Sequence, residues 1–180
     1  DHSSVSRTRR LLDYQTHQEV FDWVLKVLAK AKLLKGKTLG VDATTLDANA
    51  AMRSIVRRDS GESYDEFLTE LAKASGIETP TREDLAKIDK KRPKKGSNKD
   101  WEHPHDPDAR ITKMKDRRTH MAHKVEHAVD MVTQAIVALT LPSADEGDTE
   151  SLPWTLLRTE LNLEKVSQDP AAKKRLHPNP

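Results

Sequence analysis

The sequence predicts a mixed α/β chain in which strands and helices alternate along the polypeptide. Three observations lead to this prediction. Apolar residues recur at steps of three and four near the start and near the end of the chain, which is the helical period. A short segment rich in Val, Leu and Thr follows the first helical pattern. Two further runs in the second half have the alternating or continuous apolar pattern of strands.

The first predicted helix covers residues 17–34, where Val20, Val24 and Val27 fall on one face. Gly36 is a suitable C-terminal stop, so residues 1–36 are expected to form an N-terminal helical segment. Residues 37–46 change character and predict a strand. We expect the main domain to begin here and to cover residues 37–180.

Asp42 lies inside this predicted strand. Aspartate is uncommon in strands and costly to bury without a partner. One interpretation is a carboxylate that is satisfied by a neighbouring cation or by backbone amides. The other is a metal ligand, because Mg²⁺ prefers oxygen donors and a strand holds a carboxylate rigidly. The pattern alone leaves both interpretations open.

A helical and basic insertion is expected at about residues 47–115. Ser63 and Glu66 have capping-box spacing and predict a helix that Gly76 ends. Thr81 and Asp84 predict a second, shorter helix that ends at about residue 89. Residues 87–99 hold seven Lys or Arg and one Asp, with Pro and Gly as breakers, and are expected to form a basic loop. Residues 101–108 are expected to be irregular.

The last part of the chain is expected to contain two strands and a helix. Residues 118–130 alternate between two faces, and residues 135–141 are strongly apolar. Their short connection predicts a hairpin. Residues 149–167 are expected to be helical, with Pro153 in the first turn.

Composition excludes several classes of protein. The chain has no cysteine, so disulfides and thiolate metal sites are excluded. It contains neither a dinucleotide-binding nor a phosphate-binding glycine motif, and no nucleophile elbow. No apolar run approaches the roughly 20 residues of a membrane span, so a cytoplasmic location without a membrane partner is expected. The formal net charge of +2 does not by itself indicate nucleic acid.

Basic residues and histidines form two further candidate sites. The basic loop is either a solvated segment or a contact for phosphates, with Trp101 behind it as a candidate for stacking on a base. The candidate phosphate contacts are Lys90, Lys91, Arg92, Lys94, Lys95 and Lys99. His123 and His127 would lie about 13 Å apart on a strand, too far to share one ion. His103, His105, Asp106 and Asp108 form a denser but weakly organised set of possible metal ligands.

Several separated segments resemble bacterial insertion-sequence transposases of the IS5/IS1182 type, within the IS4-like DDE group. The similar segments are Gly36 to Leu46, Ala50 to Asp59, Asp106 to Lys115 and His123 to Asp130. The resemblance implies an RNase H-like fold, of which this chain would hold the first strand, the helical insertion, the β-hairpin and a helix. It also implies Mg²⁺-dependent DNA cleavage and strand transfer in transposition, a form of DNA recombination.

The resemblance implies a catalytic role for one residue of this chain. Asp42 matches the first Asp of the triad and would bind Mg²⁺ in the intact enzyme. The second Asp belongs to an Asp-x-Gly-Tyr segment that this sequence lacks, and the Glu is also missing. We therefore expect the chain to be a piece of a longer transposase that is inactive alone. Its expected partner is DNA, both transposon ends and target, and formation of a homodimer is possible. The alternatives are a noncatalytic DNA-binding or interaction module and a degenerate remnant.

Overall fold

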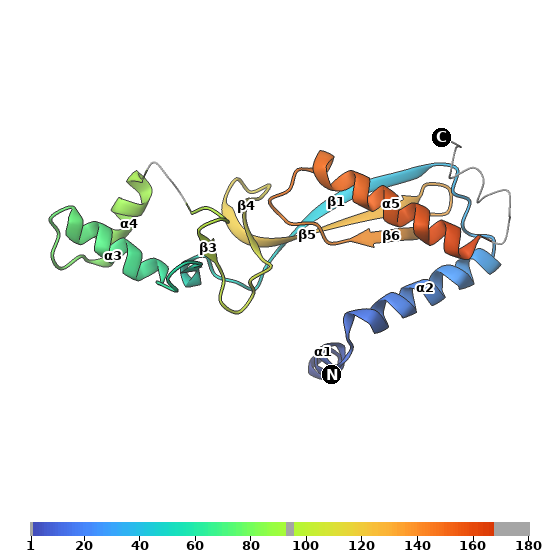
Figure 1. Cartoon of the computed structure of the whole chain (residues 1–180), viewed down its shortest axis with the longest axis horizontal. Coiled ribbons are helices and arrows are strands. Elements are labelled where there is room, and N and C mark those ends of the chain that lie inside the picture. Colours follow the sequence, from blue (N-terminus) through green and yellow to red (C-terminus); the bar gives the residue numbers. More distant parts are fainter. Residues whose placement is uncertain (1, 93–95, 168–180) are drawn as a thin grey trace. The chain divides into compact units, whose positions relative to one another are not determined.

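The structure is a computed structural model that describes residues 2–92 and 96–167 (Figure 1). In chain order the elements are α1 (His2–Leu11), α2 (Tyr14–Lys30), β1 (Leu39–Asp47), the 3-10 helix η1 (Met52–Ser54), β2 (Val56–Arg57), α3 (Tyr64–Ala74), α4 (Arg82–Lys91), β3 (Trp101–Glu102), β4 (Arg110–Lys113), β5 (Thr119–Asp130), β6 (Ile136–Thr140) and α5 (Asp148–Val166). The predicted mixed α/β class is confirmed.

The helix boundaries follow local capping chemistry. Asp13 caps α2 by accepting a hydrogen bond from the Thr16 amide at 2.7 Å. Both predicted capping boxes are present, at the starts of α3 and α4. The expected stop of the first helix at Gly36 is wrong, because α2 already ends at Lys30. Pro153 lies inside α5 and not in its first turn, because that helix begins at Asp148.

The main sheet is built around the long strand β5. On one side β5 pairs with β1, and on the other it pairs antiparallel with β4 at residues 119–122 and with β6 at residues 126–129. The predicted hairpin between the last two strands is therefore confirmed. The second, smaller sheet consists of β2 and β3, which pair antiparallel.

Two predictions for the insertion are wrong. The expected basic loop starts as helix, because α4 continues to Lys91. The segment expected to be irregular contains β3, and β4 was not predicted at all. β4 has only one apolar residue, Ile111, so it lacks an alternating pattern of its own. Its strand conformation depends on pairing with β5, which is a contact distant in sequence.

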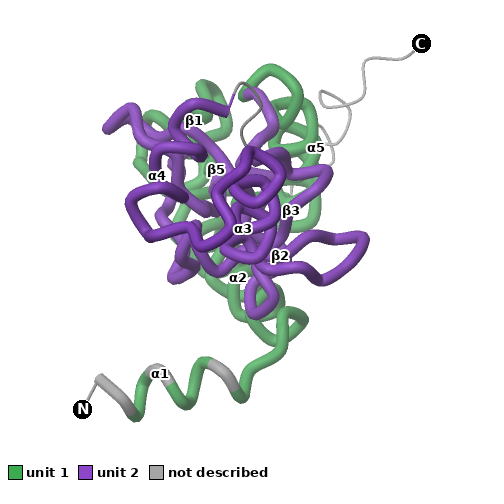
Figure 2. Tube along the Cα trace, turned by 90° about the vertical axis from the view of Figure 1, so that its left-hand side faces the viewer, with its two compact units in different colours: residues 1–43, 126–140, 148–180 green, residues 44–125, 141–147 purple. Residues whose placement is uncertain are grey.

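The chain divides into two compact units, which Figure 2 shows in different colours. Unit 1 comprises residues 1–43, 126–140 and 148–180, and unit 2 comprises residues 44–125 and 141–147. In unit 1 a small core forms around Ala128, Val137 and Ala138. In unit 2 the core is centred on Ile55, Trp101 and other buried apolar residues. The N-terminal helices thus belong to the same unit as β6 and α5.

Among the described residues, none of the helices has the length and apolar character that crossing a membrane requires.

Candidate functional site

Asp42 lies near the middle of β1 with its side chain exposed. Its neighbour Val41 packs against the unit 1 core around Ala128, on the side of the sheet that α5 covers. Successive side chains of a strand point to opposite faces, so Asp42 lies on the face away from α5. The alternating burial of Val41, Asp42 and Ala43 agrees with this placement.

Two backbone hydrogen bonds fix what lies opposite Asp42. The Met131 amide donates to the Thr38 carbonyl at 3.0 Å, and the Ala48 amide donates to the Met121 carbonyl at 2.8 Å. The start of β1 therefore lies beside the end of β5, which makes the pair antiparallel. The same number of residues separates the bonds on each strand, so the register has no net insertion. This register places Asp42 opposite His127, and cross-strand neighbours share one face.

The face that carries Asp42 is only partly covered. His127 is half-buried, and a methyl group at Gly40 would lie 2.6 Å from Met131 Sδ, so Met131 packs closely over this part of the strand. No hydrogen bond or ion pair joins Asp42 to another residue in the described part of the chain. Among the described residues, none therefore neutralises or hydrogen-bonds the Asp42 carboxylate. Its oxygens face solvent.

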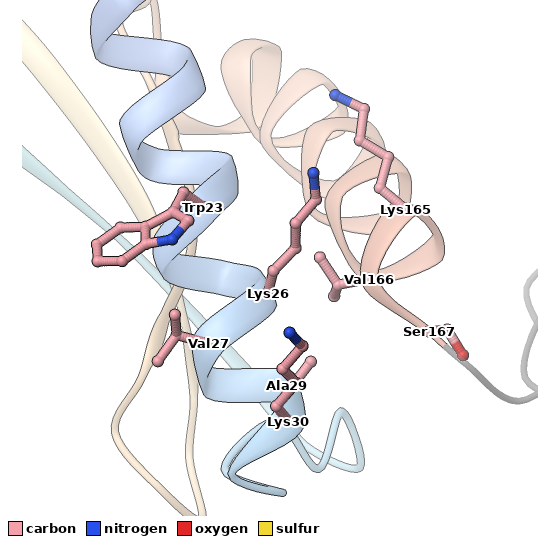
Figure 3. A pocket seen from close by; sticks show the side chains of 8 residues that line it. All are labelled: Trp23, Lys26, Val27, Ala29, Lys30, Lys165, Val166 and Ser167. Atoms are coloured by element: carbon pink, nitrogen blue, oxygen red, sulfur yellow. The ribbon is translucent and has the colours of Figure 1, made fainter.

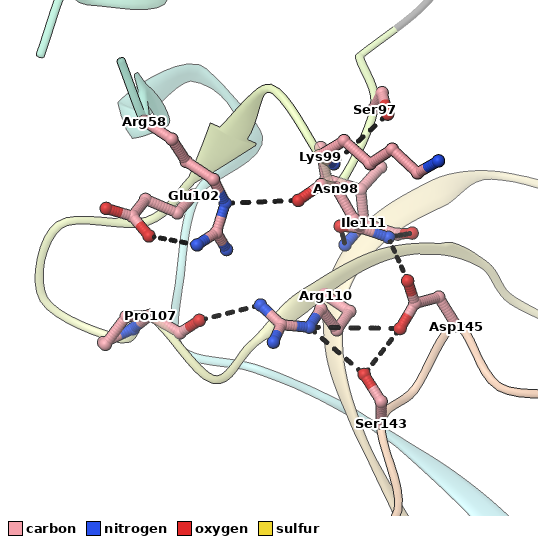
Figure 4. A network of polar contacts seen from close by, with 10 residues as sticks. All are labelled: Arg58, Ser97, Asn98, Lys99, Glu102, Pro107, Arg110, Ile111, Ser143 and Asp145. Atoms are coloured by element: carbon pink, nitrogen blue, oxygen red, sulfur yellow. Dashed lines mark hydrogen bonds and ion pairs between the residues drawn. The ribbon is translucent and has the colours of Figure 1, made fainter. Parts of the chain in front are cut away.

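The candidate phosphate contacts have different surroundings. Lys90 and Lys91 are exposed in the last turn of α4, whereas Lys94 and Lys95 lie outside the described residues. Lys99 is exposed beside the polar network around Asn98 and Arg110, and its side chain points away from that network (Figure 4).

Arg92 is held inside unit 2. Its Nη2 donates to Tyr64 Oη at 2.7 Å and to Asp89 Oδ1 at 3.0 Å, and its side chain is 13% exposed. The guanidinium also lies over the rings of Tyr64 and Phe67. Burial, with the neighbouring Asp89 carboxylate, raises the pKa of Tyr64 to about 12. A phosphate would have to compete with these internal partners for Arg92.

Trp101 is a core residue. It is 4% exposed and makes edge-to-face contacts with Tyr64 at 5.2 Å and with Phe67 at 5.3 Å between ring centroids. The suggestion that it stacks on a base is therefore wrong, because its ring faces are covered by the unit 2 core. A single tryptophan after a basic run does not distinguish an exposed aromatic from a buried one.

The histidine-rich segment does not assemble a metal centre. His123 Nε2 lies 3.0 Å from Asp106 Oδ2, and the His103 Nδ1 accepts from the His105 amide at 3.4 Å. The Asp106 carboxylate is therefore engaged by His123, and the His103 ring by a backbone amide. Across residues 2–92 and 96–167 no group of three or more His, Asp or Glu side chains is arranged to hold a metal ion.

Two buried acids of β5 were not identified from the sequence. Glu126 is 1% exposed and accepts hydrogen bonds from Ser151 and from Thr155, the latter at 2.6 Å. Asp130 is fully buried and accepts from four backbone amides. Glu126 and Asp130 each lie two residues from the buried Ala128, and residues two apart on a strand share a face. This spacing could have indicated from the sequence that both acids lie on the buried face.

Comparisons of the chain with protein-family models, with curated proteins and with solved structures find no match.

Proposed function

We propose that this chain is part of a DDE-type transposase in which Asp42 is one of the carboxylates that bind divalent metal ions. The observation that carries the proposal is the position of Asp42. It is an exposed acid on a strand, on the sheet face away from α5, with no ion pair to a described residue. A rigid, uncommitted carboxylate is what metal-dependent phosphoryl transfer requires of a ligand.

The order of the strands also supports the proposal. β1, β5 and β6 are neighbours in this order, the pairs run antiparallel, and α5 packs beside β6. The resemblance to transposases predicts this arrangement for the first three strands and first helix of an RNase H-like fold. The outer edge of β1 has no partner among the described strands, which leaves room for a further strand next to Asp42.

The described residues do not fit a two-metal site by themselves. They supply one carboxylate where the DDE triad needs three, and no metal-binding group forms among them. The sequence contains no Asp-x-Gly-Tyr segment. We therefore propose that the chain alone does not cleave DNA. The Mg²⁺ of the intact enzyme would be held by Asp42 together with carboxylates that these residues do not provide.

Metal binding at Asp42 can be tested by NMR. Millimolar Mn²⁺ should broaden the backbone signals of Val41, Ala43 and His127 before other signals, and Asp42→Asn should abolish this selectivity. Asp108→Asn removes another exposed carboxylate and should leave the broadening unchanged. Broadening that is equal at both acids, or that survives Asp42→Asn, would refute the assignment.

Catalysis needs a separate assay. A labelled duplex incubated with the chain and Mg²⁺ or Mn²⁺ should stay intact. Cleavage that disappears in Asp42→Ala would overturn the proposed inactivity while supporting Asp42 as the catalytic acid.

A noncatalytic DNA-binding module is the second candidate, and the exposure of Lys90, Lys91 and Lys99 favours it. Phosphate contacts by these lysines would give sequence-independent, salt-sensitive binding. In a gel-shift assay, changing all three to Gln should weaken binding of duplex DNA. The same binding before and after the substitutions would exclude this surface.

A further inference from the structure

Unit 1 contains a groove between the C-terminal half of α2 and the end of α5 (Figure 3). Its volume is about 280 Å³. The lining includes three lysines, Lys26, Lys30 and Lys165, and the apolar residues Trp23 and Val27. No acidic side chain lines it. The volume is at the lower end for ligand pockets, so the groove fits a segment lying across it better than an enclosed molecule.

The groove belongs to a segment whose charges are all positive. Between Trp23 and Val41 the sequence has five lysines and no acid, namely Lys26, Lys30, Lys32, Lys35 and Lys37. All five are exposed. The formal net charge of the whole chain is only +2, so this segment concentrates positive charge far above the average. Such a concentration attracts polyanions.

Helix stability accounts for only part of the positive charge in the groove. Lys26 and Lys30 are four residues apart on α2, where like charges destabilise a helix by a few tenths of a kcal/mol. Only Lys30 lies in the last turn, where the helix dipole favours a cation. Neither residue makes an ion pair with any residue that the structure describes. Their charges are therefore available to a ligand.

Lys165 is placed beside them by a contact between the two helices. Its Nζ lies 3.3 Å from Asp22 Oδ2, and its side chain remains 55% exposed. In Figure 3 Lys26 and Lys165 extend in the same direction from α2 and α5. Asp22 thus orients Lys165 at the rim of the groove and neutralises only part of the local charge.

Trp23 adds a flat apolar surface. Its side chain is 63% exposed, in contrast to the buried Trp101. Trp23 and Val27 are one helical turn apart, and in Figure 3 both side chains lie on the side of α2 away from α5. Lys26 follows Trp23 by three residues and is therefore its neighbour on the surface of the helix. Exposed aromatic rings next to cations are the elements with which proteins bind single-stranded nucleic acid, by stacking on bases and contacting phosphates. An acidic peptide would use the lysines but would gain little from the indole.

We infer that this α2–α5 groove binds a nucleic-acid strand, with Lys26, Lys30 and Lys165 contacting phosphates and Trp23 stacking on a base. The lining of the groove includes neither Asp42 nor any residue of α4, and the inference does not require Asp42 to bind a metal. If the chain is part of a transposase, the groove adds a DNA contact on the helices of unit 1.

The test measures binding of a fluorescein-labelled oligothymidylate to the full chain by anisotropy at several salt concentrations. The double variant Lys26→Gln/Lys30→Gln should weaken binding at low salt by ten-fold or more. It should also reduce the slope of log affinity against log salt by about 1.4, since each single-strand phosphate contact contributes about 0.7. The control Lys73→Gln/Lys115→Gln removes the same charge from exposed lysines outside the basic loop and should leave both quantities nearly unchanged.

Tryptophan fluorescence tests the stacking. The chain has three tryptophans, and Trp101 is buried, so Trp154→Phe leaves Trp23 as the exposed fluorophore. The oligonucleotide should quench this fluorescence, and Trp23→Ala should weaken binding by roughly ten-fold. All substituted residues are exposed, and far-ultraviolet circular dichroism verifies that each variant keeps the parent helix content.

Several results would overturn the inference. Equal losses in the two lysine double variants would show that only net charge matters. Binding of a poly-glutamate peptide as tight as that of the oligonucleotide, with no effect of Trp23→Ala, would assign the groove to an acidic protein segment. Asp42→Ala should leave oligonucleotide binding unchanged, so a failure of the metal-site proposal and a failure of the groove are distinguishable.

Discussion

Asp130 offers the sharpest test of how unit 1 is held together. It is fully buried at the end of β5. Its Oδ2 accepts from the amides of Lys35 and Gly36 at 2.6 and 2.8 Å, and its Oδ1 accepts from those of Val132 and Thr133 at 2.9 and 3.2 Å. One carboxylate therefore organises both the hairpin turn and the segment that leads from α2 into β1.

The expected cost of Asp130→Asn follows from these four bonds. The amide keeps one acceptor oxygen but presents an NH₂ group to two backbone donors, so two bonds to a charged group are lost. At roughly 1.5–3 kcal/mol for each such bond, the lower end of this range gives an expected loss of about 3 kcal/mol for the two bonds. For a chain of this size that lowers Tm by roughly 6–12 °C.

The pH dependence gives an independent check. Burial alone would raise the pKa of Asp130, but the four backbone donors outweigh it and hold this pKa below its ordinary value. A carboxyl whose pKa is lowered by folding stabilises the protein above its unfolded pKa, and this stabilisation is lost as pH falls through the folded pKa. The parent should therefore lose stability below about pH 4, and Asp130→Asn should lose less over that range.

Urea unfolding followed by circular dichroism measures both effects. Asp42→Asn is the matched control, because it makes the same substitution at an exposed strand residue and should change stability by less than about 0.5 kcal/mol. A loss of under about 0.5 kcal/mol in Asp130→Asn, with an unchanged acid profile, would refute the role assigned to this carboxylate.

Three further predictions concern buried side chains. Trp101→Ala should lower the free energy of unfolding by about 3–5 kcal/mol in urea denaturation, and a loss below 1 kcal/mol would contradict its place in the core. Glu126→Gln should cost about 2 kcal/mol in thermal unfolding, because the amide nitrogen replaces one of the two oxygens that accept from Ser151 and Thr155; a neutral effect would contradict these bonds. Ultraviolet titration should show Tyr64 ionising with a pKa of about 12, and Asp89→Asn should lower it.

The sequence predicted best those features that depend on neighbouring residues. The capping boxes at Ser63 and Thr81 involve residues only three apart, and both are present in the structure. The long strand β5 was found because twelve residues alternate between two environments. The hairpin followed from a short connection. Local signals of this kind remain readable without knowledge of the rest of the fold.

Features that depend on distant contacts were missed. β4 becomes a strand because residues 119–122 of β5 pair with it, which its own four residues do not indicate. Trp101 is buried because Tyr64 and Phe67, on a helix far away in the sequence, cover its ring. Arg92 was predicted from charge alone, whereas Asp89 and Tyr64 engage its guanidinium.

The acids on the strands of unit 1 show why the site needed the structure. Asp42, Glu126 and Asp130 are all carboxylates within strand patterns, and composition and strand pattern alone do not show which of them has free oxygens. Glu126 and Asp130 lie on the face that α5 covers or at the buried end of β5, where hydroxyls and amides occupy their oxygens. Asp42 lies on the other face and stays exposed. Because a carboxylate already saturated by donors makes a poor metal ligand, Asp42 is the one of these three acids that can take that role.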